Sequence, residues 1–153
     1  MDDRGFLASI KIGRAVRLLL KNGCSVGEKN GEGRCALQHF AEHDKEARAI
    51  EHVLAHHPEE CAAAGCLDEA LRISLIAGCF DNAYWLTDAG TSPSEEMVLE
   101  AMGVLAEEAK ATREPTYMDV HYVLDDCKAF AEYAGIFGKD LQACIANYEK
   151  ACP

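Results

Sequence analysis

The sequence predicts an all-α fold built as a solenoid of stacked helix pairs, and three observations lead to this prediction. Apolar residues recur at helical spacing along most of the 153 residues, and no segment alternates apolar and polar residues as a half-buried strand does. Glycines recur where these apolar runs stop. The helical pattern also repeats about every 33 residues, as in proteins whose short helix pairs must stack on their neighbours.

The repeat is visible in the distances between equivalent leucines. Leu20 and Leu54 are 34 residues apart, and so are Leu37 and Leu71. Pairs of short helices that recur at this period cannot bury an apolar face alone. The spacings predict three such pairs, which cover residues 6–20, 36–57 and 67–90.

The best-preserved junction between two pairs lies within residues 18–41. Three consecutive leucines end one helix, and Gly23 supplies the left-handed conformation that terminates it. Three further glycines among polar residues follow before Ala36 restarts the helical pattern, which is turn chemistry. We therefore expect residues 23–35, called the finger below, to form a turn between two helices.

The second and third pairs end differently. Pro58 closes the second pair, and residues 59–66 are expected to form a connector to the third. Gly78 and Gly90 end the two helices of the third pair. Trp85 falls at a leucine position of the second of these helices, so we expect it in the core.

After Gly90 the pattern changes. Ser92, Pro93 and Glu95 suit the N-cap, N1 and N3 positions of a helix that runs to about residue 105, as a truncated fourth unit. Two longer helices follow, the first capped by Thr116, and they do not keep the repeat period.

These two helices are expected to close the exposed apolar end of the stack. The predicted organisation is therefore a repeat stack over residues 1–110 and a two-helix C-terminal cap over residues 111–153, packed on the stack as one domain.

Several segments resemble the ankyrin-repeat family. LLLKNGCSV at residues 18–26 is similar to the LLLxxGAdvN end of an ankyrin repeat, and GRCALQHFA at residues 33–41 is similar to its GxTPLHLAA start. Leu71, Gly78 and Gly90 keep the family's spacing of helix leucine, inter-helix glycine and terminal glycine. The resemblance covers about residues 5–105 and implies three to four degenerate ankyrin-like repeats, in which Cys35-Ala36 replaces the usual threonine-proline pair.

The resemblance also implies a function. Ankyrin-like stacks usually bind another protein through their finger loops and the concave face of their inner helices. Carried over residue by residue, this implies partner-binding residues in the finger at Glu28, Lys29, Asn30, Glu32 and Arg34. On the inner helices it implies Gln38, His39, Glu42 and Arg72. We expect a non-catalytic interaction module, a scaffold whose partner is a protein.

Charge and composition restrict the remaining possibilities. The net charge is −11, and it is uneven: residues 1–35 carry seven Lys/Arg against four Asp/Glu, whereas the rest carries eight against twenty-two. An acidic bulk argues against a nucleic-acid partner and favours a partner with basic residues.

No apolar run approaches the ~18 residues that span a bilayer, and no secretory signal is evident. We therefore expect a cytoplasmic protein with no membrane partner, whose eight scattered cysteines are mostly reduced and buried.

One cluster of chemically active residues supports a different function. Within residues 52–66 stand His52, His56, His57, Cys61 and Cys66. Two of the histidines are four residues apart, as zinc ligands on one helix face are, but the sequence contains no CxxC pair. A metal- or redox-responsive helical protein remains an alternative, and an accessory helical domain of a larger enzyme or effector is another. No nucleophile motif is recognisable, so we expect no enzyme activity and no cofactor.

A basic stripe precedes the finger. Lys11, Arg14, Arg17 and Lys21 recur at intervals of three or four residues and so share one helix face. The stripe is either a solvated outer face or a surface that docks on acidic groups.

Overall fold

The structure is a computed structural model that describes residues 11, 14–44, 47–111 and 117–151. Within these ranges every regular element is a helix, apart from an isolated antiparallel bridge between Lys29 and Cys35. The all-α prediction is therefore confirmed. None of the helices in the described ranges is both long and apolar enough to cross a bilayer.

Residues 14–21 are helical, and eight further helices follow in the described part of the chain. Their bounds are α2 (Ala36–His43), α3 (Arg48–His56), α4 (Pro58–Ala63), α5 (Leu67–Ile76), α6 (Phe80–Asp88), α7 (Glu95–Lys110), α8 (Tyr117–Ala134) and α9 (Lys139–Ala151).

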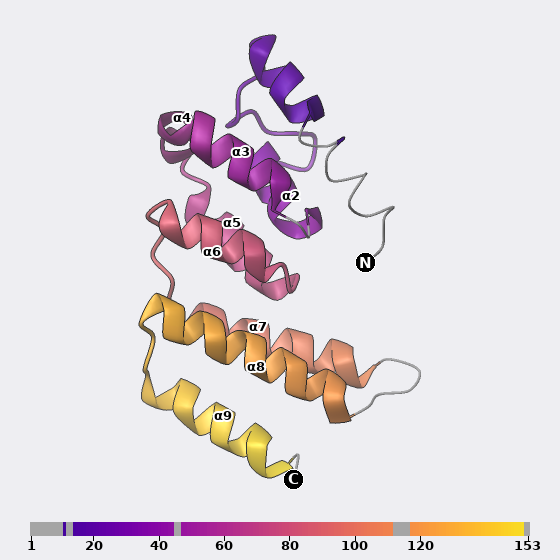
Figure 1. The fold of residues 1–153 in the computed structure, drawn as a ribbon, viewed down its shortest axis with the longest axis vertical. Helices are drawn as coiled ribbons and strands as arrows, with labels where there is room; N and C mark the ends of the chain where they lie inside the picture. The colour runs from indigo at the N-terminus through magenta and orange to yellow at the C-terminus, as the bar shows by residue number, and fades with distance from the viewer. Residues whose placement is uncertain (1–10, 12–13, 45–46, 112–116, 152–153) are drawn as a thin grey trace.

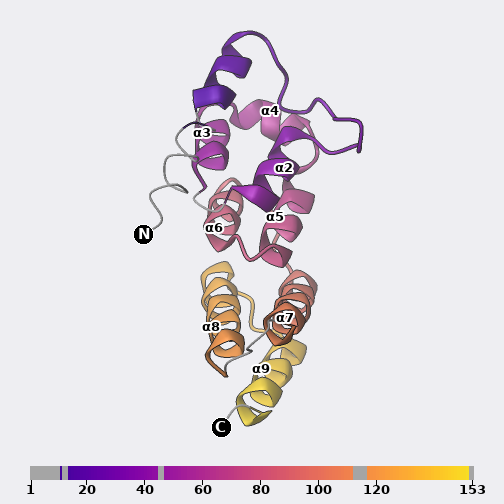
Figure 2. The same cartoon turned by 90° about the vertical axis from the view of Figure 1, so that its right-hand side faces the viewer.

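The helices stack in two columns, which Figure 2 shows side by side. One column contains α2, α5 and α7, and the other contains α3, α6 and α8; within each column every helix packs on the next. Each layer of the stack is one pair, because α2 contacts α3, α5 contacts α6, and α7 contacts α8. Figure 1 shows α9 at the end farthest from the N-terminal helix, where it packs on α7 and α8.

The core runs along the whole length of the stack. One connected cluster of buried apolar side chains extends from Val16 to Ile145, with fully buried members such as Leu37, Leu71 and Phe130 in successive layers. Burial between layers, rather than within an isolated pair, is what short helix pairs require. The predicted division at residue 110 lies between α7 and α8, which form one layer, and the separation into a stack and a cap stays a prediction.

Some helix boundaries differ from the sequence-based expectation. Helix α7 begins two residues late, because Ser94 and not Ser92 is its N-cap: the Ser94 hydroxyl accepts a hydrogen bond from the Met97 N–H at 3.3 Å. The Ser92 N–H instead donates to Asp68 Oδ1 at 2.9 Å. Both serines suit a helix N-cap, and the local sequence does not distinguish them.

Two further boundaries were predicted wrongly. The expected connector contains the short helix α4, in which Pro58 occupies the first turn, where its missing N–H costs nothing. Helix α8 ends before Gly135, whose φ is +70°, and not at Gly138. The expected helix at residues 6–10 and the Thr116 cap lie outside the described residues.

Two buried polar side chains tie neighbouring layers together. Asn82, at the start of α6, is fully buried, and its Nδ2 donates to the carbonyls of Phe40, Ala41 and Asp44 at 3.3, 3.2 and 2.8 Å. Asp44 Oδ2 in turn accepts a hydrogen bond from the Ala49 N–H at 2.6 Å, at the start of α3. These bonds satisfy carbonyl and N–H groups that helix ends leave unpaired, and they fix the α2–α3 layer on α6.

Candidate interaction surface

The tip of the finger is a tight turn, and most of the hydrogen bonds that form it involve one residue, Asn30. The Asn30 N–H donates to the Arg34 carbonyl at 2.9 Å, and Asn30 Oδ1 accepts from the N–H groups of Glu32 and Arg34 at 2.9 and 3.0 Å. Gly33 completes the turn with a φ of +77°, a left-handed conformation that favours glycine. The finger therefore has a defined shape of its own.

The base of the finger is anchored on the next layer. Val26 is buried, and Gly27 lies so close to the end of α4 that an added Cβ would be 3.1 Å from the Ala64 Cβ. Cys35, the N-cap of α2, has its Sγ 2.7 Å from the Sγ of Cys66, the N-cap of α5. The base of the finger is therefore packed against the rest of the stack.

Replacing Gly33 with alanine tests this turn. Both Gly33 and Gly31 have open space where a Cβ would stand, but only Gly33 has a positive φ. A side chain in that conformation costs about 1–2 kcal/mol, so the amide exchange rates of Asn30 and Arg34 in G33A should rise ~tenfold. In the control G31A they should not rise, and equal effects of the two substitutions would show that the turn does not depend on this conformation.

The charged residues of the finger tip face the solvent. Glu28, Lys29 and Glu32 are exposed, as the proposed binding role requires. Asn30 is exposed too, and its side-chain oxygen accepts the two hydrogen bonds that hold the turn.

Among the binding residues predicted on α2, one helps to form the start of the helix and the others lie at or near the surface. Gln38 Oε1 accepts a hydrogen bond from the Cys35 N–H at 3.0 Å, which completes the start of α2. Arg34 forms an ion pair with Glu42, joining the finger to α2. His39 is exposed, with its ring centroid 4.6 Å from that of His43. This places Arg34, Glu42 and His39 on a surface continuous with the finger.

Arg72 lies elsewhere. Its Nε donates to Glu100 at 2.8 Å and its Nη1 to Glu69 at 3.1 Å, and this bonding raises the pKa of the guanidinium. No hydrogen bond or ion pair among the described residues joins it to the finger. It borders a hollow of about 720 Å³ on α5, α7 and α9, whose other lining residues are Glu95, Glu96, Leu99, Glu100 and Asp140. Its surroundings are therefore acidic.

The fold separates the His/Cys cluster into two parts. Cys61 is buried beside Cys35 and Cys66, and burial raises the pKa of Cys61 to about 11 and that of Cys66 to about 12. Thiols with such pKa values carry little thiolate at neutral pH. None of the seven cysteines in the described ranges forms a disulfide with another of them, and five of the seven are buried. Across the same ranges no group of three or more His, Cys, Asp or Glu side chains is placed to hold a metal ion.

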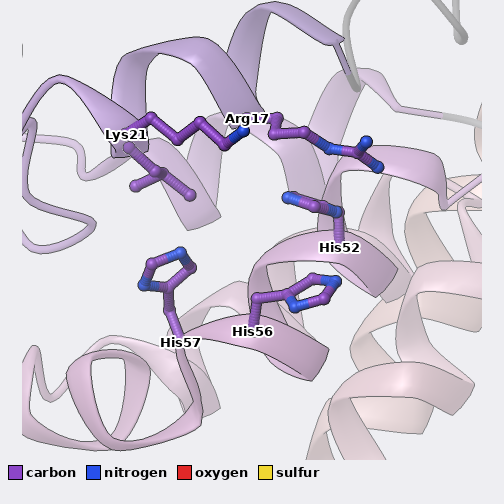
Figure 3. A pocket seen from close by; sticks show the side chains of 6 residues that line it. Arg17, Lys21, His52, His56 and His57 are labelled. Carbon is purple, nitrogen blue, oxygen red and sulfur yellow. The ribbon is translucent and has the colours of Figure 1, made fainter.

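The three histidines instead line a pocket beside the N-terminal helical segment. Figure 3 shows the rings of His52 and His57 pointing toward the segment that carries Arg17 and Lys21. These side chains line a common pocket of about 410 Å³. Both contributing motifs are visible in the sequence, as a basic stripe and a histidine cluster, but only the packing of residues 14–21 over α3 brings them together.

Contrary to the prediction, Trp85 does not lie in the core. The residue is 39% exposed on α6. It lines another hollow, of about 370 Å³, between α6 and the α3–α4 region. The adjacent Leu86 is fully buried, and so is Ala83 one turn earlier, so these two residues form the buried face of the helix.

Comparison with known proteins gives no match: neither a protein-family model, nor a curated protein, nor a solved structure is similar to this chain. The candidate function therefore rests on the residues and their geometry alone.

Proposed function

We propose that the chain is a non-catalytic protein–protein interaction module of the ankyrin type. It binds its partner through the finger and through the adjoining face of the column formed by α2, α5 and α7, called the first-helix column below. Two features support this proposal. The helix pairs stack in two columns, and the junction between the first two pairs is a turn with charged residues at its tip.

The observation that carries the proposal is the fixed shape of the finger. Asn30 and Gly33 define the turn, and Val26 and Gly27 anchor its base, while Glu28, Lys29 and Glu32 remain exposed. A loop that is ordered before binding loses less conformational entropy when a partner docks. The finger therefore offers charges in a preorganised arrangement, which favours specificity.

The first-helix column suggests the charge of the partner. Around Arg72 the carboxylates of α5, α7 and α9 outnumber the one guanidinium, and that guanidinium is already paired. Complementary potentials steer association. We propose a partner that presents basic residues to the acidic surface around Arg72 and the first half of α7, and a cytoplasmic location, where buried thiols stay reduced.

The redox alternative has one observation in its favour, the approach of Cys35 Sγ to Cys66 Sγ at 2.7 Å. Their burial and the raised pKa of Cys66 favour unreactive thiols that pack as small apolar groups. The interaction function is therefore the better supported one.

A charge swap in the finger tests the proposal. The double substitution K29E/E32K reverses both charges without changing the net charge, and both side chains are exposed, so the fold should be retained. We expect capture of partners from the native cell to fall ~tenfold, which corresponds to losing about 1.4 kcal/mol at the interface. Quantitative mass spectrometry of the captured proteins measures the change.

The matched control is the swap E107K/K110E. Glu107 and Lys110 form an exposed ion pair on α7, 3.0 Å between charged atoms, away from the finger. It should leave the captured set unchanged. If both swaps reduced capture equally, or neither did, the finger would not be the binding element.

A further inference from the structure

A strongly cationic pocket lies between the N-terminal helical segment and the C-terminal end of α3, separate from the finger. Figure 3 shows it from close by. It has a volume of about 410 Å³ and is lined by Arg17, Leu20, Lys21, His52, His56 and His57. Two permanent cations and three imidazoles therefore converge on one hollow in a chain of net charge −11.

Among the described residues, acidic side chains compensate the positive charge of this pocket only in part. No ion pair among the described residues joins Arg17 or Lys21 to an acidic side chain. Two carboxylates approach the rings: Glu60 Oε1 lies 3.1 Å from His57 Nδ1, and Glu51 acts on His52. Both act on a histidine, and in the described ranges no carboxylate forms an ion pair with either permanent cation.

The surroundings of His52 hinder its protonation. The ring centroids of His52 and His56 are 4.5 Å apart. Burial, followed by His56, Arg17 and His57, lowers the pKa of His52, and Glu51 offsets this only in part. An anion seated among these groups would relieve the repulsion and would favour the protonated rings.

We infer that this pocket binds a phosphate group, either as the free ion or as an ester on a serine side chain. A phosphate group carries about −1.5 to −2 charges at pH 7 and three acceptor oxygens. Arg17 offers the planar donor fork suited to such a group, and Lys21 and the protonated imidazoles supply further N–H donors. A carboxylate, with one charge and two oxygens, would leave several of these donors unused.

The site is expected to bind more tightly as the pH falls. In the unliganded protein the lowered pKa of His52 makes protonation of the folded state unfavourable, so stability is lost as the pH falls below the ordinary histidine value of 6.5. A bound anion raises the imidazole pKa values and removes this loss. Sulfate is the clean probe of this effect, because phosphate changes its own charge near pH 6.

The experiment titrates the full chain with inorganic phosphate, sulfate, phosphoserine and acetate at pH 6 and pH 8, following the histidine ring signals by NMR. We expect saturable shifts of His52, His56 and His57 with a dissociation constant of ~1 mM or below for phosphate at pH 6. Sulfate should bind ~tenfold more tightly at pH 6 than at pH 8, and acetate ~tenfold more weakly than phosphate. Tighter binding of phosphoserine than of phosphate identifies the ester as the ligand, and the reverse order identifies the free ion.

Two double variants locate the site. R17Q/K21Q removes the two cations of the pocket and should weaken phosphate binding ~tenfold or more. K11Q/R14Q removes the same charge from exposed positions that do not line the pocket, and should change the affinity by less than ~twofold. Equal affinities in the two variants, shifts that do not saturate, or acetate binding as tight as phosphate would overturn the assignment. The pH and acetate comparisons use the unmodified chain and so do not depend on the folding of any variant.

Discussion

Replacing Phe130 with alanine should lower the free energy of unfolding by about 3–5 kcal/mol. Phe130 lies on α8, is fully buried, and packs against Tyr84 of α6 with the ring centroids 5.6 Å apart. Truncating a buried phenylalanine removes its burial energy and leaves a cavity between two layers of the stack. The loss is a large fraction of the 5–15 kcal/mol that typically stabilises a domain.

The same experiment tests whether the C-terminal helices and the earlier pairs unfold together. Trp85 on α6 is the chain's single tryptophan, so its fluorescence reports on that layer, whereas circular dichroism reports on all helices. In F130A both signals should shift to the same lower urea midpoint. A shift in circular dichroism alone would mean that residues 111–153 unfold independently. The control F137A, at a position 68% exposed, should change stability by about 0.5 kcal/mol or less.

Replacing Asn82 with alanine should lower the free energy of unfolding by about 2–3 kcal/mol. Its amide donates to the three carbonyls at the end of α2, and substitution leaves these buried groups without that donor. Part of the loss is offset, because Asn82 Oδ1 is itself buried without a hydrogen-bond partner in the structure and alanine removes it. Urea unfolding followed by Trp85 fluorescence measures the change.

Asn22 provides the matched control. Its Nδ2 also donates to a backbone carbonyl, that of Leu18 at 2.8 Å, but in an exposed position where water replaces the lost bond. N22A should therefore cost about 0.5 kcal/mol or less. If N82A were as mild as N22A, the buried amide would not hold α6 on α2.

The sequence was sufficient for the class of fold because the helical signals are local. The leucine spacing, the glycine stops and the polar run of the finger each depend on a few neighbouring residues, and the structure places helices at all of the described repeat positions. The start of α7 was misplaced because Ser92 and Ser94 are equally good caps by residue type, and in the structure the hydroxyl of Ser94 is the one that caps the helix.

The candidate sites depended more on packing between layers. Glu28, Lys29 and Glu32 could be found from the sequence, because turn residues lie on the surface. The structural roles of Asn30 and Gln38 were not predicted. Both side chains form hydrogen bonds with the backbone, Asn30 within its own turn and Gln38 at the start of its own helix. The cationic pocket was missed for a different reason: Arg17 and His52 are 35 residues apart, and no local pattern says that their helices meet.

The most direct measurement of the interaction proposal is site-specific photo-cross-linking. A photoreactive phenylalanine analogue at position 28, in the exposed finger tip, is compared with the same analogue at position 107, on the exposed face of α7. Proteins of the native cell should be cross-linked from position 28 and not from position 107, and K29E/E32K in the same chain should reduce the adduct ~tenfold. Equal cross-linking from both positions, or adducts from position 107 alone, would contradict a partner bound by the finger.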